Sequence, residues 1–342
     1  MEFRILIVGH GSIGKRHLLI TRELLPTSEI LILRHQPTED IPKLADSVTA
    51  SLDEAIAFKP QIAIIATPAP FHIATATVLA KSNCHLLIEK PIAAESLGVK
   101  EFLAFAHETK RVCQVGYNMR FLSSLEEFSR LVRSGAIGRT LAIRCEIGQY
   151  LPNWRPGTDY RQGVSACKKL GGGVMLELSH ELDYLQWIFG PVNWVSAWSG
   201  QLSDLEIDVE DSAFLTMGFV TTTAGRETVA TLALDFVRRD TTRTCLVIGS
   251  TGSLRWNALA GTVEVFREGA SNWEQLFSQP QSRNASYRAQ FAHFLSCVES
   301  GKSPLVDGEA GLAVLRVIEA SRQSMHLGGL RQEVGKIQLS KG

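Results

Sequence analysis

The stretch Phe3-Arg4-Ile5-Leu6-Ile7-Val8-Gly9-His10-Gly11-Ser12-Ile13-Gly14 decides the fold of the first third of the chain. Its apolar half, residues 3–8, is typical of a buried parallel strand, and a helical stretch over 15–25 follows the glycines. In a G-x-G-x-x-G turn between strand and helix, the first glycine permits the tight turn, the second admits a pyrophosphate to the backbone, and the third lets the helix pack close. The turn therefore predicts a dinucleotide site whose contacts are Gly9, Gly11, Ser12, Ile13 and Gly14.

A second apolar strand, residues 29–33, ends at Arg34-His35. A site for NAD usually has Asp or Glu here, which accepts a hydrogen bond from the ribose 2′-hydroxyl. Arginine is instead the residue type that accommodates the 2′-phosphate of NADP. We therefore expect Arg34 and His35 to contact the cofactor, and we favour NADP slightly over NAD. Arg34 stacked on the adenine face is the alternative, and it would permit either cofactor.

Strand and helix patterns continue to alternate as far as residue 118. The expected helices and strands cover 52–58, 62–66, 72–81, 85–89, 95–110 and 112–115. Because the carboxyl ends of parallel strands meet at one edge of a sheet, loops 9–14, 67–72 and 89–91 should lie together there. The pattern predicts an α/β fold in which a doubly wound Rossmann domain, residues 1–118, carries the dinucleotide.

The stretch His85-Leu86-Leu87-Ile88-Glu89-Lys90-Pro91 ends the fourth expected strand at a charged pair and a proline. A surface ion pair is the ordinary interpretation of an isolated Glu-Lys-Pro. At the carboxyl edge of a sheet, however, a lysine can reach a reacting hydroxyl and move a proton. Lys90 is therefore a candidate catalytic residue, whereas Glu89 is better suited to supporting the turn.

Four motifs in order resemble the Gfo/Idh/MocA family of NAD(P)-dependent oxidoreductases. They are the glycine turn 9–14, Thr67-Pro68 with His72, Glu89-Lys90-Pro91, and Gly116-Tyr117-Asn118-Met119-Arg120-Phe121. In that family the lysine of Glu-Lys-Pro lies beside nicotinamide and substrate, so the resemblance implies this role for Lys90. We also expect Arg120 to contact substrate. The further cofactor contacts that we expect are Thr67, Pro68, His72, Glu89, Lys90 and Asn118.

From about residue 119 the pattern changes to that of a second domain, residues 119–342. Its expected strands and helices cover 122–134, 140–150, 195–198, 212–220, 227–236, 242–248, 253–256, 262–266, 287–300 and 309–325. These elements predict a substrate-binding α+β domain with an open, mostly antiparallel sheet, and its C-terminal helix can pack back on the first domain. Such a sheet often leaves one face uncovered. We expect a partner subunit to cover it, in a homodimer or homotetramer.

A loop over 151–161 is rich in aromatic and cationic residues. Long loops without a regular pattern are often functional. Trp154 and Tyr160 could stack on a sugar or cofactor ring, and Arg155 or Arg161 could hold an anionic group. The alternative is a lid that packs on its own aromatic side chains.

A triple glycine, residues 171–173, precedes a helix that we expect over 174–190. Glu177, His180 and Asp183 recur at three-residue spacing and so share roughly one face of it. A histidine titrates near neutrality and suits proton transfer, although a lone helical histidine is more often a satisfied, partly buried side chain. The family resemblance implies His180 as the acid/base, Asp183 as the acid after it, and Glu177 in place of the family's Asp. The family usually separates its first acid from the histidine by four residues, so the spacing of three here weakens the assignment of Glu177.

Composition excludes several classes of function. The 342-residue chain has a formal net charge of zero, so no basic excess indicates a nucleic-acid partner. No apolar run approaches the ~20 residues that cross a bilayer, and we expect no signal peptide, because the first strand pattern starts at residue 3. The six cysteines contain no Cys-x-x-Cys pair, so neither a metal site nor a disulfide framework is expected. We expect a cytoplasmic protein.

The resulting hypothesis is hydride transfer between nicotinamide and a hydroxyl or keto carbon of a sugar, polyol or sugar derivative. His180 would take or give the hydroxyl proton, and Lys90 would polarise the same oxygen. The expected substrate contacts are Lys90, Arg120, Trp154, Arg155, Tyr160 and His180. A redox-neutral NAD-dependent glycosidase and a non-catalytic, cofactor-binding regulator are the alternatives.

Overall fold

The computed structural model describes residues 2–37, 40–220, 227–280 and 282–335. The chain divides into two compact units. The first consists of Met1–Asn118 with Arg283–Leu312, and the second of Met119–Ser282 with Ala313–Gly342. The segment after Ser282 thus returns to the first unit, and the predicted boundaries of 1–118 and 119–342 need this correction.

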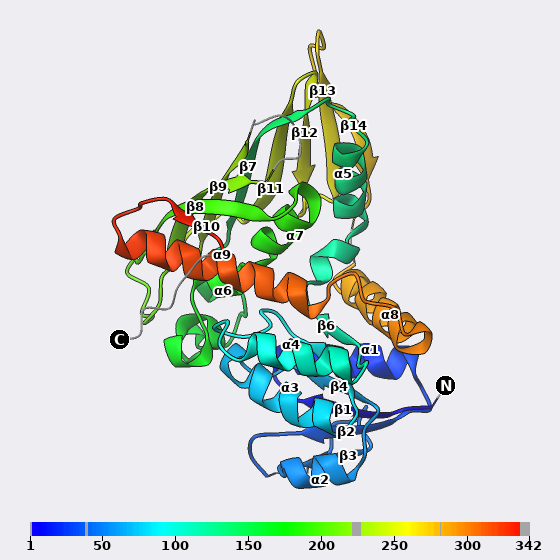
Figure 1. The fold of residues 1–342 in the computed structure, drawn as a ribbon. Helices are drawn as coiled ribbons and strands as arrows, with labels where there is room; N and C mark the ends of the chain where they lie inside the picture. The colour runs from blue at the N-terminus through cyan, green and yellow to red at the C-terminus, as the bar shows by residue number, and fades with distance from the viewer. Residues whose placement is uncertain (1, 38–39, 221–226, 281, 336–342) are drawn as a thin grey trace. The chain divides into compact units, whose positions relative to one another are not determined.

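The first unit is built on a parallel sheet with the strand order β3-β2-β1-β4-β5-β6 in the described residues (Figure 1). Neighbouring strands pair in parallel throughout. The strands are Arg4–Val8 (β1), Glu29–Leu33 (β2), Ser47–Thr49 (β3), Ile62–Ile65 (β4), His85–Ile88 (β5) and Cys113–Val115 (β6). The order reverses between β1 and β4, as in doubly wound nucleotide-binding folds. The predicted Rossmann sheet is confirmed.

Helices bury the apolar strands of this sheet. They are Ser12–Leu24 (α1), Leu52–Ala57 (α2), His72–Lys81 (α3), Val99–Glu108 (α4) and Ala285–Ser300 (α8). Ile5 and Ile7 of β1 lie in one buried cluster with Leu18 of α1 and with Phe291 and Phe294 of α8. A helix that comes from the far end of the chain therefore completes the core beside α1.

The turn between β1 and α1 is tight, because other backbone atoms lie very close to the backbone of two of its glycines. Gly9 has a φ of +94°, and a Cβ there would lie 2.8 Å from the carbonyl oxygen of Ala66. A Cβ on Gly14 would collide with the carbonyl oxygen of Gly9. At Gly11, by contrast, a Cβ would meet no atom within 4 Å. Protein packing thus requires the first and third glycines, but not the second.

The second unit contains a sheet with the order β14-β13-β12-β11-β7-β10-β9-β8-β15 over the described residues (Figure 1). Its strands are Thr140–Gly148 (β7), Val192–Gly200 (β8), Ser212–Phe219 (β9), Thr228–Asp235 (β10), Thr242–Gly249 (β11), Gly252–Asn257 (β12), Thr262–Arg267 (β13), Glu274–Ser278 (β14) and Gln332–Glu333 (β15). The pair β7 and β10 runs parallel, whereas the other pairs run antiparallel. The predicted open, mostly antiparallel sheet is confirmed.

Helices cover one face of this second sheet. They are Ser123–Arg133 (α5), Val174–Glu177 (α6), His180–Phe189 (α7) and the part of Gly308–His326 (α9) that belongs to the second unit. Trp256 of β12 is fully buried between Phe128 of α5 and Tyr184 of α7, with ring centroids 6.3 and 5.3 Å away. On the other face the side chains of Trp198 and Phe214 stay 45% and 49% exposed.

The expected continuous helix over 174–190 is wrong, because it is broken after Glu177. Leu178 leaves the helical region with φ −99° and ψ 23°, and a new helix, α7, begins at His180. The hydroxyl of Ser179 donates to the carbonyl oxygen of Leu176 at 2.8 Å, which closes the break. Glu177 and His180 therefore belong to different helices, and their spacing of three does not place them on one helical face.

The glycine turn generates a stability prediction with an internal control. Gly14→Ala should lower the free energy of unfolding by about 1–3 kcal/mol, because its Cβ forces α1 away from β1. Gly11→Ala should change it by less than about 1 kcal/mol, since the loss of cap propensity and the reduced unfolded-state entropy oppose each other. Urea unfolding followed by circular dichroism measures both. Equal losses for the two variants would contradict the packing argument.

Candidate active site

The carboxyl edge of the parallel sheet gathers four loops of the first unit. They follow β1, β4, β5 and β6, and the strand reversal lies between β1 and β4. Ligands of open α/β sheets bind outside this edge, at the reversal. The loops that were predicted to converge are therefore attached to neighbouring strands of one sheet.

The first of these loops leaves the N-terminus of α1 open. Gly11 caps the helix without a side-chain hydrogen bond, and the first turn contains no acidic residue. The free N–H groups and partial positive charge of a helix N-terminus attract phosphate. Because no protein atom lies near the missing Cβ of Gly11, the glycine there suits a ligand that lies directly on the backbone. Ser12 and Ile13 begin the helix beside it.

Basic side chains gather at the carboxyl ends of β1 and β2. Burial lowers the pKa of His10, and the charges of Lys15 and Arg34 lower it further, against the opposing effect of Asp40. The backbone N–H of Arg34 donates to the carbonyl oxygen of Thr49 at 2.8 Å, which fixes the start of its loop. Arg34, which was predicted from the sequence, is half-buried, and His35 next to it is exposed. His10 and Lys15 were missed, although both flank the glycines of the motif.

His72 holds two loops together. It is buried, its Nε2 lies 2.7 Å from the carbonyl oxygen of Thr67, and its Nδ1 lies 2.9 Å from that of Pro91. Burial lowers its pKa, although the two carbonyl hydrogen bonds act in the opposite direction. Both ring nitrogens thus face the protein, so we reassign His72 from cofactor contact to support of the loops after β4 and β5.

Thr67 differs from its neighbours because its hydroxyl oxygen is buried without a hydrogen-bond partner among the described residues. Buried polar atoms almost always have a partner, so an exception needs an explanation. Pro68, the next residue, caps the short helix Ala69–Phe71 in an extended conformation. A nucleotide at this edge would account for the Thr67 hydroxyl, and the residues present fit a dinucleotide.

Glu89 is buried at the end of β5 and paired with His17 of α1. Its Oε1 lies 2.7 Å from Nε2 of the histidine, and its Oε2 accepts from the backbone N–H of Lys90 at 3.2 Å. Lys90 itself is half-buried, and its peptide bond to Pro91 is cis. Glu89 therefore supports the turn that carries Lys90, and its carboxylate oxygens are turned toward protein groups.

Asn118 and Arg120 also have partners within their own units. The side-chain amide of Asn118 donates to the Ser286 hydroxyl at 2.7 Å. Arg120 donates two hydrogen bonds to Asp183, from Nε to Oδ2 at 2.9 Å and from Nη2 to Oδ1 at 2.6 Å. Burial raises the pKa of Asp183, and the Arg120 guanidinium opposes this shift. We reassign Arg120 and Asp183 from substrate contact and catalysis to an ion pair that holds α7.

His180 begins α7 and is half-buried. Buried ion pairs follow it on the helix, because Glu181 pairs with Arg243 at 2.9 Å just before Asp183 pairs with Arg120. Glu177 ends the preceding helix and accepts from the Ser165 hydroxyl at 2.6 Å. The acids around His180 are thus engaged by protein groups, and sequence reasoning missed the partners Ser165 and Arg243.

The triple glycine packs against the chain. The carbonyl oxygens of Val164 and Ser165 fill the space where Gly172 would carry a Cβ, and the Glu210 carboxylate does so at Gly173. Glu210 also caps α6, because its carbonyl oxygen accepts from the N–H of Val174 at 3.1 Å. Protein groups therefore occupy the N-terminus of α6.

The loop over 151–170 is folded into short 3-10 turns. They are Leu151–Asn153, Tyr160–Gln162, Val164–Ala166 and Lys168–Leu170. The Trp154 ring meets Phe236 edge-on at 5.1 Å, and its indole N–H donates to the carbonyl oxygen of Gln149 at 3.0 Å. The Tyr160 hydroxyl accepts from the N–H of Glu206 at 3.3 Å. These contacts hold both aromatic side chains of the loop against residues of the second unit that lie outside the loop.

The cations of this loop differ in their surroundings. Arg161 pairs with Asp159 at 2.8 Å and with Glu206 at 3.1 Å. Arg155 is exposed. Of the two arginines that could hold an anionic group, Arg155 is the better candidate, because the charge of Arg161 is already balanced.

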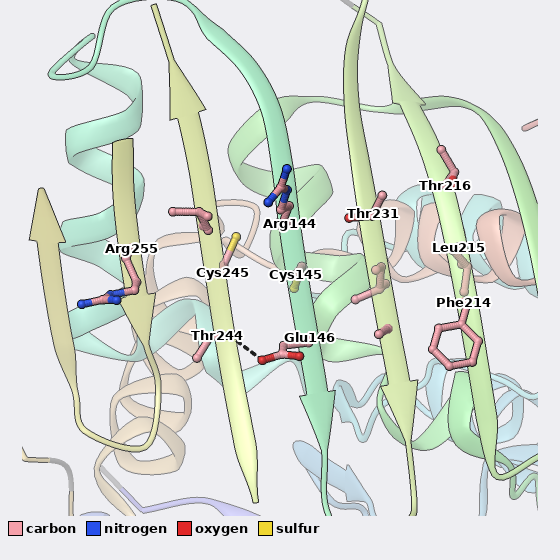
Figure 2. Close-up of a pocket in the computed structure, with 13 residues that line it drawn as sticks. Arg144, Cys145, Glu146, Phe214, Leu215, Thr216, Thr231, Thr244, Cys245 and Arg255 are labelled. Atoms are coloured by element: carbon pink, nitrogen blue, oxygen red, sulfur yellow. Dashed lines mark hydrogen bonds between the residues drawn. The ribbon is translucent and has the colours of Figure 1, made fainter. Parts of the chain in front are cut away.

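A pocket of about 560 Å³ lies on the open face of the second sheet (Figure 2). Its lining includes Arg144, Glu146, Phe214, Thr231, Thr244 and Arg255. Successive side chains of a strand point to opposite faces of the sheet. The Cys145 thiol lies 2.8 Å from the Tyr184 hydroxyl of α7, so Cys145 faces the helices, whereas Arg144 and Glu146 face the pocket. The pocket is thus on the opposite side of the sheet from the helix that begins at His180.

Neither a metal cluster nor a membrane-spanning helix is found in the described residues. No cluster of three or more His, Cys, Asp or Glu side chains in this part of the chain is suited to a metal ion. Each helix in the described ranges is too short or too polar to cross a membrane. All six cysteines are free thiols.

Known proteins resemble both units. Residues 3–117 match the model of the oxidoreductase family with an NAD-binding Rossmann fold, and residues 129–330 match its C-terminal alpha/beta domain. Myo-inositol 2-dehydrogenase of Thermotoga maritima is 25% identical over 72% of this chain and 72% of its own length. The rhizopine catabolism protein MocA of Rhizobium meliloti is 25% identical over 58% of this chain, which spans 61% of that protein.

Solved structures agree with the fold. Levoglucosan dehydrogenase in complex with NADH superposes with a TM-score of 0.85 at 18% identity, covering 98% of this chain and 100% of the other. The WlbA dehydrogenase of Bordetella pertussis, in complex with NADH and UDP-GlcNAcA, has a TM-score of 0.80 at 20% identity, with coverage of 98% and 100%. Because the two family models together span nearly all of residues 3–330, this chain belongs to the Gfo/Idh/MocA oxidoreductase family.

Proposed function

We propose that the protein is an NAD(P)-dependent dehydrogenase or reductase of a sugar, polyol or sugar derivative. The observation that carries the proposal is the edge of the parallel sheet. There the open backbone of Gly11, the unsatisfied hydroxyl of Thr67 and the supported turn of Lys90 belong to neighbouring loops. Relatives named myo-inositol 2-dehydrogenase and D-glucoside 3-dehydrogenase support a polyhydroxylated substrate.

In the proposed reaction, each of the candidate residues has a separate role. A bound nicotinamide supplies the hydride acceptor or donor. Lys90 donates a hydrogen bond to the reacting oxygen of the substrate and stabilises its developing negative charge. His180 takes the hydroxyl proton during oxidation and returns it during reduction. The ion pair of Arg120 with Asp183 keeps α7, and with it His180, in place.

Substitution of the two proposed catalytic residues tests this function. Lys90→Ala and His180→Ala should each lower kcat by about 10²–10⁴-fold, the usual effect of removing an acid/base or charge-stabilising group. Activity is followed at 340 nm with NAD or NADP and a panel that contains myo-inositol, levoglucosan and D-glucose. Lys81→Ala and His326→Ala, at exposed helix ends, are matched controls that should keep full activity.

Full activity in both Lys90→Ala and His180→Ala would refute the mechanism. The same assay separates the alternatives. A redox-neutral glycosidase would release sugar from a glycoside without a net change at 340 nm. A regulator would bind the cofactor and turn over no member of the panel.

We propose NADP as the preferred cofactor, because two cationic side chains, Arg34 and Lys15, both lie near His10 of the glycine turn. The wild-type protein should bind NADPH more tightly than NADH in a fluorescence titration. Arg34→Ala should weaken NADPH binding by about tenfold or more, as expected for the loss of a charged hydrogen bond, and should change NADH binding little. Gly11→Ala should weaken both. A clear preference of the wild type for NADH would contradict the 2′-phosphate assignment.

We propose that a second copy of the chain covers the open face of the second sheet. The exposed rings of Trp198 and Phe214 lie side by side on β8 and β9, with centroids 6.0 Å apart. Arg144 and Glu146 carry opposite charges on the same face, so the surface can complement a copy of itself. The net charge of zero does not oppose association.

Light scattering after size exclusion tests this assembly. The wild type should elute as a dimer or tetramer, and Trp198→Glu with Phe214→Glu should shift it to the monomer because two charges would be buried in the contact. Leu259→Glu is the matched control, an exposed leucine in the turn after β12. A monomeric wild type, or a double variant with unchanged mass, would contradict the proposal.

A further inference from the structure

A buried histidine–carboxylate pair joins α1 to the end of β5. His17 and Glu89 are 72 residues apart in sequence, yet Nε2 and Oε1 lie within 2.7 Å. Their side chains are 1% and 8% exposed. Glu89 directly precedes Lys90 in the sequence, and neither member of the pair contributes an atom to the proposed chemistry.

The hydrogen bond assigns the proton of the histidine ring. Nε2 faces a carboxylate oxygen and therefore donates, whereas Nδ1 is buried without a hydrogen-bond partner among the described residues. A proton on Nδ1 would bury an unsatisfied donor, which is unfavourable. His17 thus serves as a one-sided donor that points at Glu89.

The second carboxylate oxygen of Glu89 also has a hydrogen-bond partner in the protein. Oε2 accepts from the backbone N–H of Lys90, and it lies 2.9 Å from the place where Gly116 would carry a Cβ. Burial alone raises the pKa of Glu89, but the His17 hydrogen bond, together with the charge of Lys90, holds it below its ordinary value. The carboxylate is therefore a fixed acceptor that reaches the main chain of the Lys90 turn.

The returning segment of the chain fixes the His17 ring from its other side. Tyr287 of α8 meets the ring edge-on, with centroids 6.1 Å apart at 80°. The Arg16 guanidinium lies 4.6 Å from the Tyr287 centroid. Neighbours on α1, α8 and the loop after β6 thus restrict the side chains of His17 and Glu89 to one arrangement.

We propose that His17 and Glu89 form a positioning dyad that sets the turn of Lys90. The inference rests on the proposed function only in that Lys90 serves the reacting hydroxyl. The dyad touches neither cofactor nor substrate in this assignment, and it acts through the backbone N–H of Lys90. His17 is the new functional residue, and the sequence motifs did not indicate it.

Competitive labelling of the lysines tests the dyad without a substrate. The full-length protein is treated with acetic anhydride, and peptide mass spectrometry measures the labelling rate of Lys90 against an exposed lysine, Lys81. His17→Leu and Glu89→Gln should each raise the rate at Lys90 at least threefold, because the turn loses its tether. The double variant should match the single variants, since both act through one interaction. His293→Gln removes another histidine of the same unit and should leave the rate unchanged.

The pH dependence adds a readout that general loss of packing does not reproduce. Besides His17, the charged and titratable groups that act on Glu89 are Lys90 and buried His72. In the His17→Leu variant the hydrogen bond no longer opposes the effect of burial on the pKa of Glu89. The pKa should therefore rise, and Glu89 should take up a proton at a higher pH. Lys90 labelling should then show an additional step in the acid range that the wild type lacks. His17→Gln, which retains an N–H donor, should restore the wild-type profile.

Wild-type labelling of Lys90 in His17→Leu overturns the dyad. If His17→Leu does not fold, Glu89→Gln decides, and an unchanged rate in that variant overturns the proposal equally. NADH titration of the same proteins keeps the two proposals apart. A wild type that binds neither NADH nor NADPH refutes the proposed function and leaves the labelling result standing. With an active substrate, a kcat at least tenfold lower at an NADH affinity within threefold of wild type supports positioning.

Discussion

A carboxylate that is removed from water has to be paired, and Glu89 imposes this requirement on the whole edge of the parallel sheet. Burying an ionised group without compensating hydrogen bonds costs several kcal/mol. Glu89 meets the requirement with a ring N–H from α1 and a backbone N–H from its own turn, beside a glycine that leaves room for it. The loops after β1, β5 and β6 are therefore fixed to one another around a single carboxylate, and these loops surround the expected place of the cofactor.

The same principle organises the start of α7 in the second unit. Glu181 and Asp183 are buried, and Arg243 and Arg120 neutralise them from β11 and from the segment before α5. A buried ion pair contributes little net stability, but removal of one partner leaves an uncompensated charge. The pairs therefore restrict α7 to one position. A side chain is held most accurately on an element that cannot shift, and His180, the proposed acid/base, begins this helix.

The sequence predicted the backbone where local pattern and long-range packing agree. The apolar runs and the glycine turn were sufficient for the parallel sheet, because its strands are buried on both faces and its first turn needs glycine at 9 and 14. The pattern failed at residues 178–179, because the apolar spacing continues unchanged through the helix break. It also failed at 283–312, since Phe291 and Phe294 show that a helix is amphipathic but do not show which core it completes.

The side chains of the candidate site were harder to predict, because a polar residue in a loop can bind a ligand or hold the fold. Arg120, Asn118, His72 and Trp154 have the chemistry of ligand contacts, yet each has a partner in its own unit. Their partners are distant in the sequence, so no local pattern distinguishes the two uses. His17 carried a weak signal, since it follows Gly14 by three residues and so lies on the helix face that meets β1. Gly11 carries the opposite signal, because nothing inside the protein requires a glycine there. A residue type that its own fold does not explain is the stronger evidence for a ligand.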